Sequence, residues 1–197
     1  MKNAIILFVR HPEKGKVKTR LAKEIGDDAA LQVYQDLLRH THSVTCNLAC
    51  DKFVFYTDEI IETDSWENDS YFKRAQRGND LGERMLNSFT ELFSLKYKKV
   101  IIIGSDCPGL SSALIQLAFK ALDTSTVVLG PAADGGYYLL GLTQLVEELF
   151  KNKTWSTDTV MKETIGDLIN KKLSYSMLQV LQDIDTKEDL SNISHYM

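Results

Sequence analysis

The sequence predicts an α/β fold in which helices cover both faces of a mostly parallel central sheet. Strand-length segments alternate with segments of helical periodicity along the chain, and this alternation is typical of parallel sheets whose crossover connections are helices. Residues 4–9 and 100–104 are continuous apolar runs, as expected of strands buried on both faces. The length of 197 residues suits one domain, and we expect residues 1–197 to form it.

The first part of the chain predicts three strands and one long helix. Residues 4–9 form the first strand, and a basic loop separates it from a helix over residues 27–42. Residues 52–57 and 71–76 predict two further strands, whereas the acidic stretch 58–69 lacks periodicity and is expected to be irregular. The helix is expected to bury the apolar residues that recur at helical spacing: Ala30, Val33, Tyr34, Leu37 and Leu38.

Two capped helices surround the most apolar strand, residues 99–104. Asp80 is a predicted N-cap, with Glu83 as its capping-box partner. The helix behind it is expected to bury one face, made of Leu81, Met85, Leu86, Phe89, Leu92 and Phe93. Ser111 begins the second helix, whose expected buried residues are Leu114, Leu117, Ala118 and Ala121.

The last third of the chain continues the alternation. In order it predicts strands 126–130 and 136–142, a helix over 157–170, a weak strand 173–178 and a short helix capped by Thr186 and Asp189. Ligands of open α/β sheets bind at the carboxyl ends of the strands. The polar motifs below each follow a predicted strand, so we expect them to meet at that edge.

Composition and charge exclude several classes of function. The net charge of -4 argues against general binding to nucleic acid or to an anionic membrane. The apolar runs are far shorter than a membrane span, and the N-terminal run is short for a signal-peptide core. The three cysteines are an odd set without a Cys-x-x-Cys pair. We therefore expect a cytoplasmic protein with neither nucleic acid nor membrane as a partner.

The loop after the first strand concentrates positive charge. Between Arg10 and Arg20 there are five Lys or Arg residues and one acidic residue, Glu13. The loop, which includes Gly15 and Lys18, has neither the Walker A pattern nor the dinucleotide fingerprint. It can present backbone amides and cations to phosphates, so a small polyanion such as a nucleotide phosphate is the expected ligand. The alternative is an ordinary solvated basic loop.

A carboxylate follows the most buried strand, in the sequence Gly104-Ser105-Asp106. Hard divalent ions bind through one or two protein carboxylates, with phosphate oxygens and water as the remaining ligands. Asp106 therefore predicts a site for Mg²⁺ or Mn²⁺. The alternative is that Asp106 caps the turn or helix that follows.

A second carboxylate stands in Asp134-Gly135-Gly136, just after another strand. The two glycines allow a sharp turn or a close approach of the backbone to a ligand. Asp134 is expected near Asp106, where two carboxylates beside one phosphate pocket fit a metal and a base, or two metal contacts. The alternative is an Asp-Gly turn without chemistry.

Two weaker motifs complete the predicted site. The loop around Gly78 and Asp80 leads into a helix start, which is a natural anion site. Trp155, followed by Ser156, has the ring size to stack on a sugar or acceptor. The alternative for Trp155 is an ordinary buried side chain beside a capped helix.

Taken together and in order, the motifs resemble a known group. The chain resembles the bacterial family of GT-A-type nucleotide-diphospho-sugar transferases, which is associated with radical-SAM and arsenosugar gene clusters. It is more distantly similar to 2-phospholactate and molybdenum-cofactor guanylyltransferases. The resemblance covers nearly the whole chain and is carried by Arg10-x-Pro12-x-x-Gly15-x-x-Lys18-Thr19-Arg20-Leu21, Asp80-Leu81-Gly82-x-Arg84-Met85, Gly104-x-Asp106-Cys107-Pro108, Asp134-Gly135-Gly136-Tyr137, Trp155-Ser156-Thr157 and Asp183-Ile184-Asp185-Thr186-x-x-Asp189-Leu190.

The resemblance implies a GT-A (Rossmann-like) three-layer αβα sandwich, a nucleotide-activated donor and a divalent cation, Mg²⁺ or Mn²⁺. GT-A enzymes hold the metal with an Asp-x-Asp motif, whereas the matching stretch here, Gly104-Ser105-Asp106, has one carboxylate. Asp134 is therefore the expected second metal contact.

We expect a metal-dependent transferase that moves a glycosyl group from a nucleotide sugar to a small-molecule acceptor. The alternatives are a nucleotidyltransferase that uses a nucleoside triphosphate and a phosphorylated acceptor, and a nucleotide-binding module without catalysis. The predicted catalytic residues are Asp134, Lys18 and Arg20, and the predicted metal ligands are Asp106 and Asp134. The nucleotide is expected to contact Arg10, Gly15, Lys18, Arg20, Gly78, Asp80 and Ser105, and the substrate Gly135, Gly136, Trp155 and Ser156.

Overall fold

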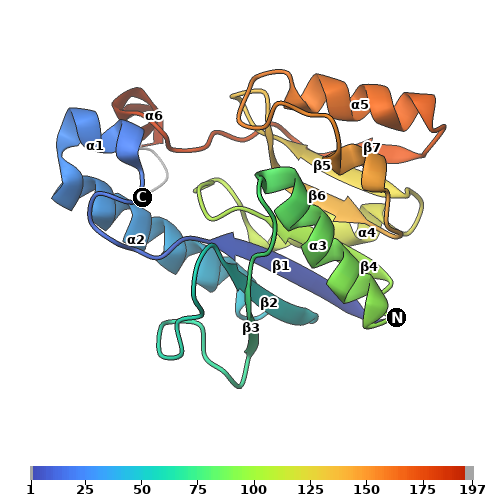
Figure 1. Ribbon diagram of the computed structural model, residues 1–197, viewed down its shortest axis with the longest axis horizontal. Coiled ribbons are helices and arrows are strands. Elements are labelled where there is room, and N and C mark those ends of the chain that lie inside the picture. The colour runs from blue at the N-terminus through green and yellow to red at the C-terminus, as the bar shows by residue number, and fades with distance from the viewer. Residues whose placement is uncertain (1, 194–197) are drawn as a thin grey trace.

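The computed structural model describes residues 2–193 and has one seven-stranded sheet, in the order β3-β2-β1-β4-β6-β5-β7. Each predicted strand is present within two residues of its expected ends, and the α/β class is confirmed (Figure 1). The strands are β1 (Asn3–Val9), β2 (Asp51–Tyr56), β3 (Tyr71–Ala75), β4 (Lys99–Ile103), β5 (Val127–Pro131), β6 (Tyr137–Leu142) and β7 (Tyr175–Met177).

The sheet is mostly parallel, with one reversed strand. β1 pairs in parallel with β2 and β4, and β2 pairs with β3 in the same way. β6 is antiparallel to both of its neighbours, β4 and β5. Because β6 runs opposite to both β4 and β5, β5 runs in the same direction as β4 and ends at the same edge. The connection 132–136, which follows β5, therefore lies at the edge where β1 and β4 end.

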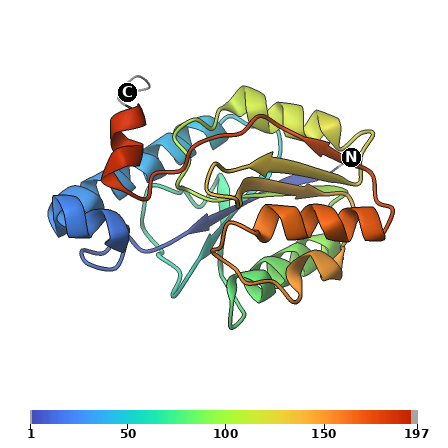
Figure 2. The same cartoon turned by 90° about the horizontal axis from the view of Figure 1, so that it is seen from above.

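Helices cover both faces of the sheet, which gives the expected three layers. Viewed from above, α2 and α4 lie on one side of the strands, and α3 and α5 lie on the other (Figure 2). The helices are α1 (Thr19–Ile25), α2 (Asp27–Thr45), α3 (Leu81–Ser94), α4 (Ser112–Ala121), the 3₁₀ helix η1 (Glu147–Phe150), α5 (Val160–Asn170) and α6 (Lys187–Ile193).

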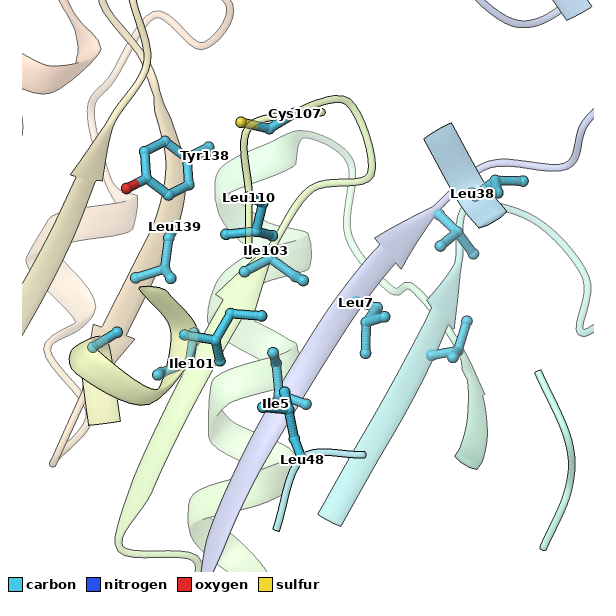
Figure 3. Packing of buried hydrophobic residues seen from close by; sticks show 14 of the residues in the cluster. Ile5, Leu7, Leu38, Leu48, Ile101, Ile103, Cys107, Leu110, Tyr138 and Leu139 are labelled. Carbon is cyan, nitrogen blue, oxygen red and sulfur yellow. The ribbon is translucent and has the colours of Figure 1, made fainter. Parts of the chain in front are cut away.

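The sheet separates two large clusters of buried residues, and a third, smaller cluster joins α1 and α2 to the segment before α6 through Leu21, Leu37 and Ile184. On one face, Ile5 and Ile101 pack with residues of α2 and α4, and Leu110 of the loop after β4 packs with Ile103 (Figure 3). On the other face, Phe89 of α3 belongs to a cluster that also includes residues of α5 and η1. Every residue of β4 is buried, so the loop that follows it emerges from the centre of the molecule.

Several details differ from the sequence expectations. Leu81 is 40% exposed and Leu117 is 52% exposed, so the predictions that they are buried were wrong. In α4 both Ile115 and Ala118 are fully buried. Ala118 was predicted to be buried, whereas Ile115 was not, because the side of the helix that is covered includes Ile115 rather than Leu117. The helices α1 and η1 were not predicted, and α5 begins at Val160 rather than residue 157.

Between residues 2 and 193, every helix is either too short or too polar to span a bilayer.

Candidate functional site

A pocket of about 660 Å³ opens at the edge of the sheet where β1 and β4 end. Its wall includes the ends of both strands, the basic loop, the start of α3 and the connection 132–136. The turn before α5 and the segment before α6 complete the wall. The pocket therefore lies at the edge predicted for ligand binding.

The basic loop is anchored to α2 through a buried phenol. The Arg10 amide donates a hydrogen bond to the Tyr34 hydroxyl at 2.8 Å, and this hydroxyl lies 3.4 Å from the Ser105 hydroxyl. Burial raises the pKa of Tyr34 above its ordinary value, so the phenol stays neutral. This link sets the position of the loop after β1 relative to the loop after β4.

Only part of the charge of the basic loop faces the pocket. Lys14 pairs with Asp28 at 2.7 Å, and Lys16 pairs with Glu13 at 2.6 Å. By contrast, Arg10, Lys18 and Arg20 line the pocket wall. The loop therefore contributes three cations to the site rather than its whole excess of positive charge.

Lys18 forms the most buried ion pairs of the site. Its ammonium Nζ lies 3.0 Å from Oδ1 of Asp106 and 3.1 Å from Oδ1 of Asp185. The Lys18 side chain is 5% exposed. Burial acts to lower the pKa of Lys18, but the two carboxylates outweigh burial and raise it above its ordinary value. Lys18 is therefore charged at neutral pH.

The backbone at Lys18 is in the left-handed region, with φ 47° and ψ 43°. Residues other than glycine adopt this conformation at a cost. Lys18 occupies the N-cap position of α1 but makes no side-chain capping hydrogen bond. Its side chain is instead directed to the pocket, where the ion pairs offset the strain.

Asp183 lies beside this pair, and its environment disfavours ionisation. Burial, followed by repulsion from Asp106 and Asp134, raises the pKa of Asp183 to about 7. Its Oδ1 atom is buried and has no hydrogen-bond partner among residues 2–193. The Ile184 amide donates to the Asp106 carbonyl at 3.1 Å, which holds the segment with Asp183 and Asp185 against the loop after β4.

Asp134 has a different local role. Its Oδ1 accepts a hydrogen bond from the Gly136 amide at 2.9 Å within the connection between β5 and β6. Gly135 has φ 90°, and a side chain there would overlap the backbone of Asp158. Asp134 therefore forms an Asp-Gly turn, the alternative stated above. Asp134 also lines the pocket, and its negative charge contributes to the raised pKa of Asp183.

The start of α3 has a modified capping box. The Asp80 carboxylate accepts a hydrogen bond from the Glu83 amide at 2.8 Å, as predicted. The Glu83 carboxylate reaches Asn79 rather than Asp80, at 2.8 Å from the Asn79 amide. Gly78 has φ 138°, and a side chain there would meet Glu83. Because the Asp80 carboxylate stands at the helix start, a phosphate at this position would meet negative charge.

Trp155 lines the same pocket as the basic loop. The indole packs against Gly82 of α3, where an added Cβ would overlap it. Trp155 is half-buried and lines the pocket together with Ser156. Its ring is thus held by the core on one side while part of it stays accessible.

The structure brings most of the predicted site residues to this one pocket. The residues that line it are Arg10, Lys18, Arg20, Asp80, Ser105, Asp106, Asp134, Gly136, Trp155 and Ser156. Gly15, Gly78 and Gly135 are not among the lining residues, and each has a positive φ that shapes an adjoining turn.

Sequence reasoning did not select Asp183 or Asp185 as site residues, although both line the pocket. A signal was available, since Asp183-Ile184-Asp185 is itself an Asp-x-Asp sequence. It follows an irregular segment rather than a strong strand, so its place in the sequence does not mark it as lying at a strand end.

The donors at the pocket suit a metal that completes its coordination with ligand oxygens. Within residues 2–193, no group of three or more His, Cys, Asp or Glu side chains is arranged to hold a metal ion. Asp106 and Asp185 nevertheless converge on a single cation, the Lys18 ammonium. Two carboxylates are the usual protein contribution to a Mg²⁺ site with phosphate ligands, so the donor set fits such an ion.

Comparison with known proteins identifies relatives of the chain. Residues 40–157 match the family model described as "Uncharacterized protein conserved in bacteria (DUF2064)". No curated protein matches the chain. A crystal structure from Desulfovibrio desulfuricans G20, described as a candidate nucleotide-diphospho-sugar transferase, is 31% identical with a TM-score of 0.90. The match covers 98% of this chain and 86% of that chain.

More distant structures share the fold. A cytidylyltransferase from Leptospira borgpetersenii is 17% identical with a TM-score of 0.59, and the match covers 100% of this chain and 88% of that chain. Rv0371c from Mycobacterium tuberculosis H37Rv, solved in complex with manganese, is 12% identical with a TM-score of 0.53. That match covers 99% of this chain and 98% of the other.

The comparisons agree with the expected fold and with the expectation of a transferase. The nucleotide-diphospho-sugar transferase fold predicted from the motifs is the fold of the D. desulfuricans structure. The association with radical-SAM and arsenosugar gene clusters stays a prediction. From the family match and the 31% identity over nearly its whole length, the chain belongs to the bacterial DUF2064 family.

Proposed function

We propose that the protein is a metal-dependent transferase that moves a glycosyl group from a nucleotide diphosphate donor to a small acceptor. The observation that carries the proposal is the meeting of Arg10, Lys18 and Arg20 with Asp106 and Asp185 in one pocket. Cations alone would suit many anions, and carboxylates alone would suit many metals. Together they suit a diphosphate that binds with a divalent ion.

The donor diphosphate is assigned to the side of the pocket formed by the basic loop. Arg20 is 73% exposed and Arg10 is also exposed, so both guanidinium groups are free to turn toward a phosphate. A guanidinium can hold a phosphate through two parallel hydrogen bonds. As charge develops on the leaving diphosphate, these cations stabilise it.

Asp106 and Asp185 are the residues proposed to hold the cation. A divalent ion, when bound, supplies charge neutralisation for the leaving diphosphate. Asp134, the second ligand expected from the motif, does not pair with Lys18, and one of its oxygens is engaged by Gly136. The geometry therefore favours Asp185 as the second ligand and leaves Asp134 as the proposed base that takes the acceptor proton.

The acceptor is assigned to the side of the pocket near Trp155 and Ser156. The half-buried indole offers a flat apolar surface on which a sugar ring can stack. Asp134 lies in the same wall, as a base for an acceptor hydroxyl requires. Small polar acceptors fit this combination.

A second function is favoured by one observation. The pocket wall contains three basic-loop cations, Arg10, Lys18 and Arg20, which is enough to hold a triphosphate. In that case the protein would be a nucleotidyltransferase, in which a phosphorylated acceptor attacks the α-phosphate of a nucleoside triphosphate and pyrophosphate leaves.

Thermal-shift and turnover assays distinguish these functions. Nucleotide sugars and nucleoside triphosphates are each tested with and without Mg²⁺ or Mn²⁺, and the released nucleoside diphosphate or pyrophosphate is measured. Metal-dependent stabilisation by a nucleotide sugar, with release of nucleoside diphosphate, supports glycosyl transfer. The same result for a triphosphate, with release of pyrophosphate, supports nucleotidyl transfer. Binding that ignores the metal and yields no product would indicate a non-catalytic module.

A further inference from the structure

The Lys18 ammonium stands where the proposed function needs a divalent cation. It lies 3.0 Å from Asp106 and 3.1 Å from Asp185, the two residues assigned to the metal. We propose that Lys18 is an internal stand-in for this cation, which occupies the Asp106–Asp185 pair in the nucleotide-free protein and leaves it for the phosphates when metal and nucleotide bind. The inference rests on the proposed function and adds an order of events to it.

The distribution of exposure supports a stand-in role. The Lys18 side chain is 5% exposed, whereas those of Asp106 and Asp185 are 45% and 48% exposed. The ammonium is thus buried behind two carboxylates that remain open to the pocket. A metal ion can reach the carboxylates from the pocket, but it has to compete with the ammonium for the same Oδ1 atoms.

The negative charges around Asp106 and Asp185 explain why a cation is needed between these two carboxylates both with and without bound nucleotide. Besides Asp106 and Asp185, the lining of the pocket contains the carboxylates of Asp134 and Asp183. Without any cation, the carboxylates of this group would oppose one another in a partly buried space. Lys18 supplies one positive charge to the nucleotide-free protein, and the incoming metal would supply two.

The structure also gives Lys18 a means of leaving. Its backbone is held in the left-handed region at φ 47° and has no side-chain cap, so the present position is not required by helix α1. Lysine is a point charge on a flexible four-carbon stem. Arg10 and Arg20 line the same pocket. They mark the surface where bound phosphates would form ion pairs with the displaced Lys18 ammonium.

This arrangement predicts that metal binds weakly on its own and better with nucleotide. A metal ion that binds without nucleotide must displace the Lys18 ammonium from both carboxylates, and no phosphate is then present to pair with the ammonium. A nucleotide supplies phosphates that accept the ammonium, and so removes the competitor. Metal and nucleotide are therefore coupled through one side chain, and coupling of this kind is reciprocal.

The test measures binding of Mn²⁺ alone to the nucleotide-free protein, by electron paramagnetic resonance of free Mn²⁺. Lys18→Met removes the charge and keeps an unbranched side chain, so it should bind Mn²⁺ about 5- to 150-fold more tightly than the parent, the usual range of coupling between sites. Lys18→Gln is a second neutral variant. Lys18→Arg keeps the charge and should bind Mn²⁺ as weakly as the parent.

Lys16→Met is the matched control. It removes a cation of the same loop that is 71% exposed and pairs with Glu13 at 2.6 Å, outside the lining of the pocket, so it should have little effect on Mn²⁺ affinity. The tight binding of Lys18→Met should disappear when Asp106→Asn is added, which places the ion at the pair. Circular dichroism checks that each variant is folded.

Equal or weaker Mn²⁺ binding by both folded neutral variants would overturn the stand-in role. An equal increase in Lys16→Met would also overturn it, since the effect would then be one of general charge. The proposed function fails by a different result, namely nucleotide binding by the parent protein that does not depend on Mg²⁺ or Mn²⁺.

Discussion

Asp183→Asn should change how the stability of the protein depends on pH. In the folded protein the pKa of Asp183 is raised from 3.8 to about 7, first by burial and then by Asp106 and Asp134. The folded state therefore holds a proton that the unfolded state has released. Stability from this group is fully present below pH 3.8, falls as the pH rises, and is lost above about pH 7.

The size of the effect follows from the width of this window. Each pKa unit of difference corresponds to about 1.4 kcal/mol, and between pH 5 and pH 7 the parent would lose about 2–3 kcal/mol through Asp183. An asparagine keeps the shape and stays neutral. The free energy of unfolding of Asp183→Asn minus that of the parent should therefore increase by about 2–3 kcal/mol as the pH rises from 5 to 8.

Urea unfolding at pH 5, 6, 7 and 8, in EDTA to remove divalent ions, measures the difference. Asp69→Asn, at an exposed position outside the pocket, is the control for loss of a carboxylate. A difference between Asp183→Asn and the parent that stays constant with pH would refute the reasoning. A difference that grows toward low pH would mean that the folded state favours the ionised carboxylate.

Three further variants test the site and its support. Arg20→Ala should weaken nucleotide binding by about 1.5–3 kcal/mol in titration calorimetry, because charge-assisted hydrogen bonds are lost; unchanged affinity would exclude a phosphate contact. Asp106→Asn should lower the metal-dependent rate by about 100-fold or more while the protein stays folded; a folded variant with the parent's rate would leave only a capping role. Gly82→Ala should destabilise the fold by about 1–3 kcal/mol in urea, because the new methyl overlaps the Trp155 indole and the Phe150 carbonyl; a stability equal to the parent's would show that both groups can move away from α3 at little cost.

The strands could be predicted because burial on both faces leaves a continuous apolar run, as in β4. The direction of β6 could not, since an apolar run reads alike in a parallel and an antiparallel strand. The errors at Leu81 and Leu117 have a related cause. Helical periodicity identifies an apolar stripe, but the part of the stripe that is covered depends on how the helix sits on the sheet.

The candidate site shows the same division between local and tertiary information. Asp106 could be selected because it follows a buried strand directly, and the basic loop because its charges are adjacent in sequence. Asp185 could not be selected in this way. Its link to Lys18 spans 167 positions of the chain, and only the folded arrangement brings the two together.

The segment that leads into α6 determines when the ligand pocket can be completed during synthesis of the chain. Asp183 and Asp185 reach the pocket because this segment is tied to the loop after β4 through Ile184, and Leu181 also forms a bridge with Ala132. During synthesis, β1 to β4 emerge well before these residues. A nascent chain can therefore assemble much of the sheet while its ligand site is still missing one wall, and the pocket cannot be complete until residues 183–185 have reached the loop after β4.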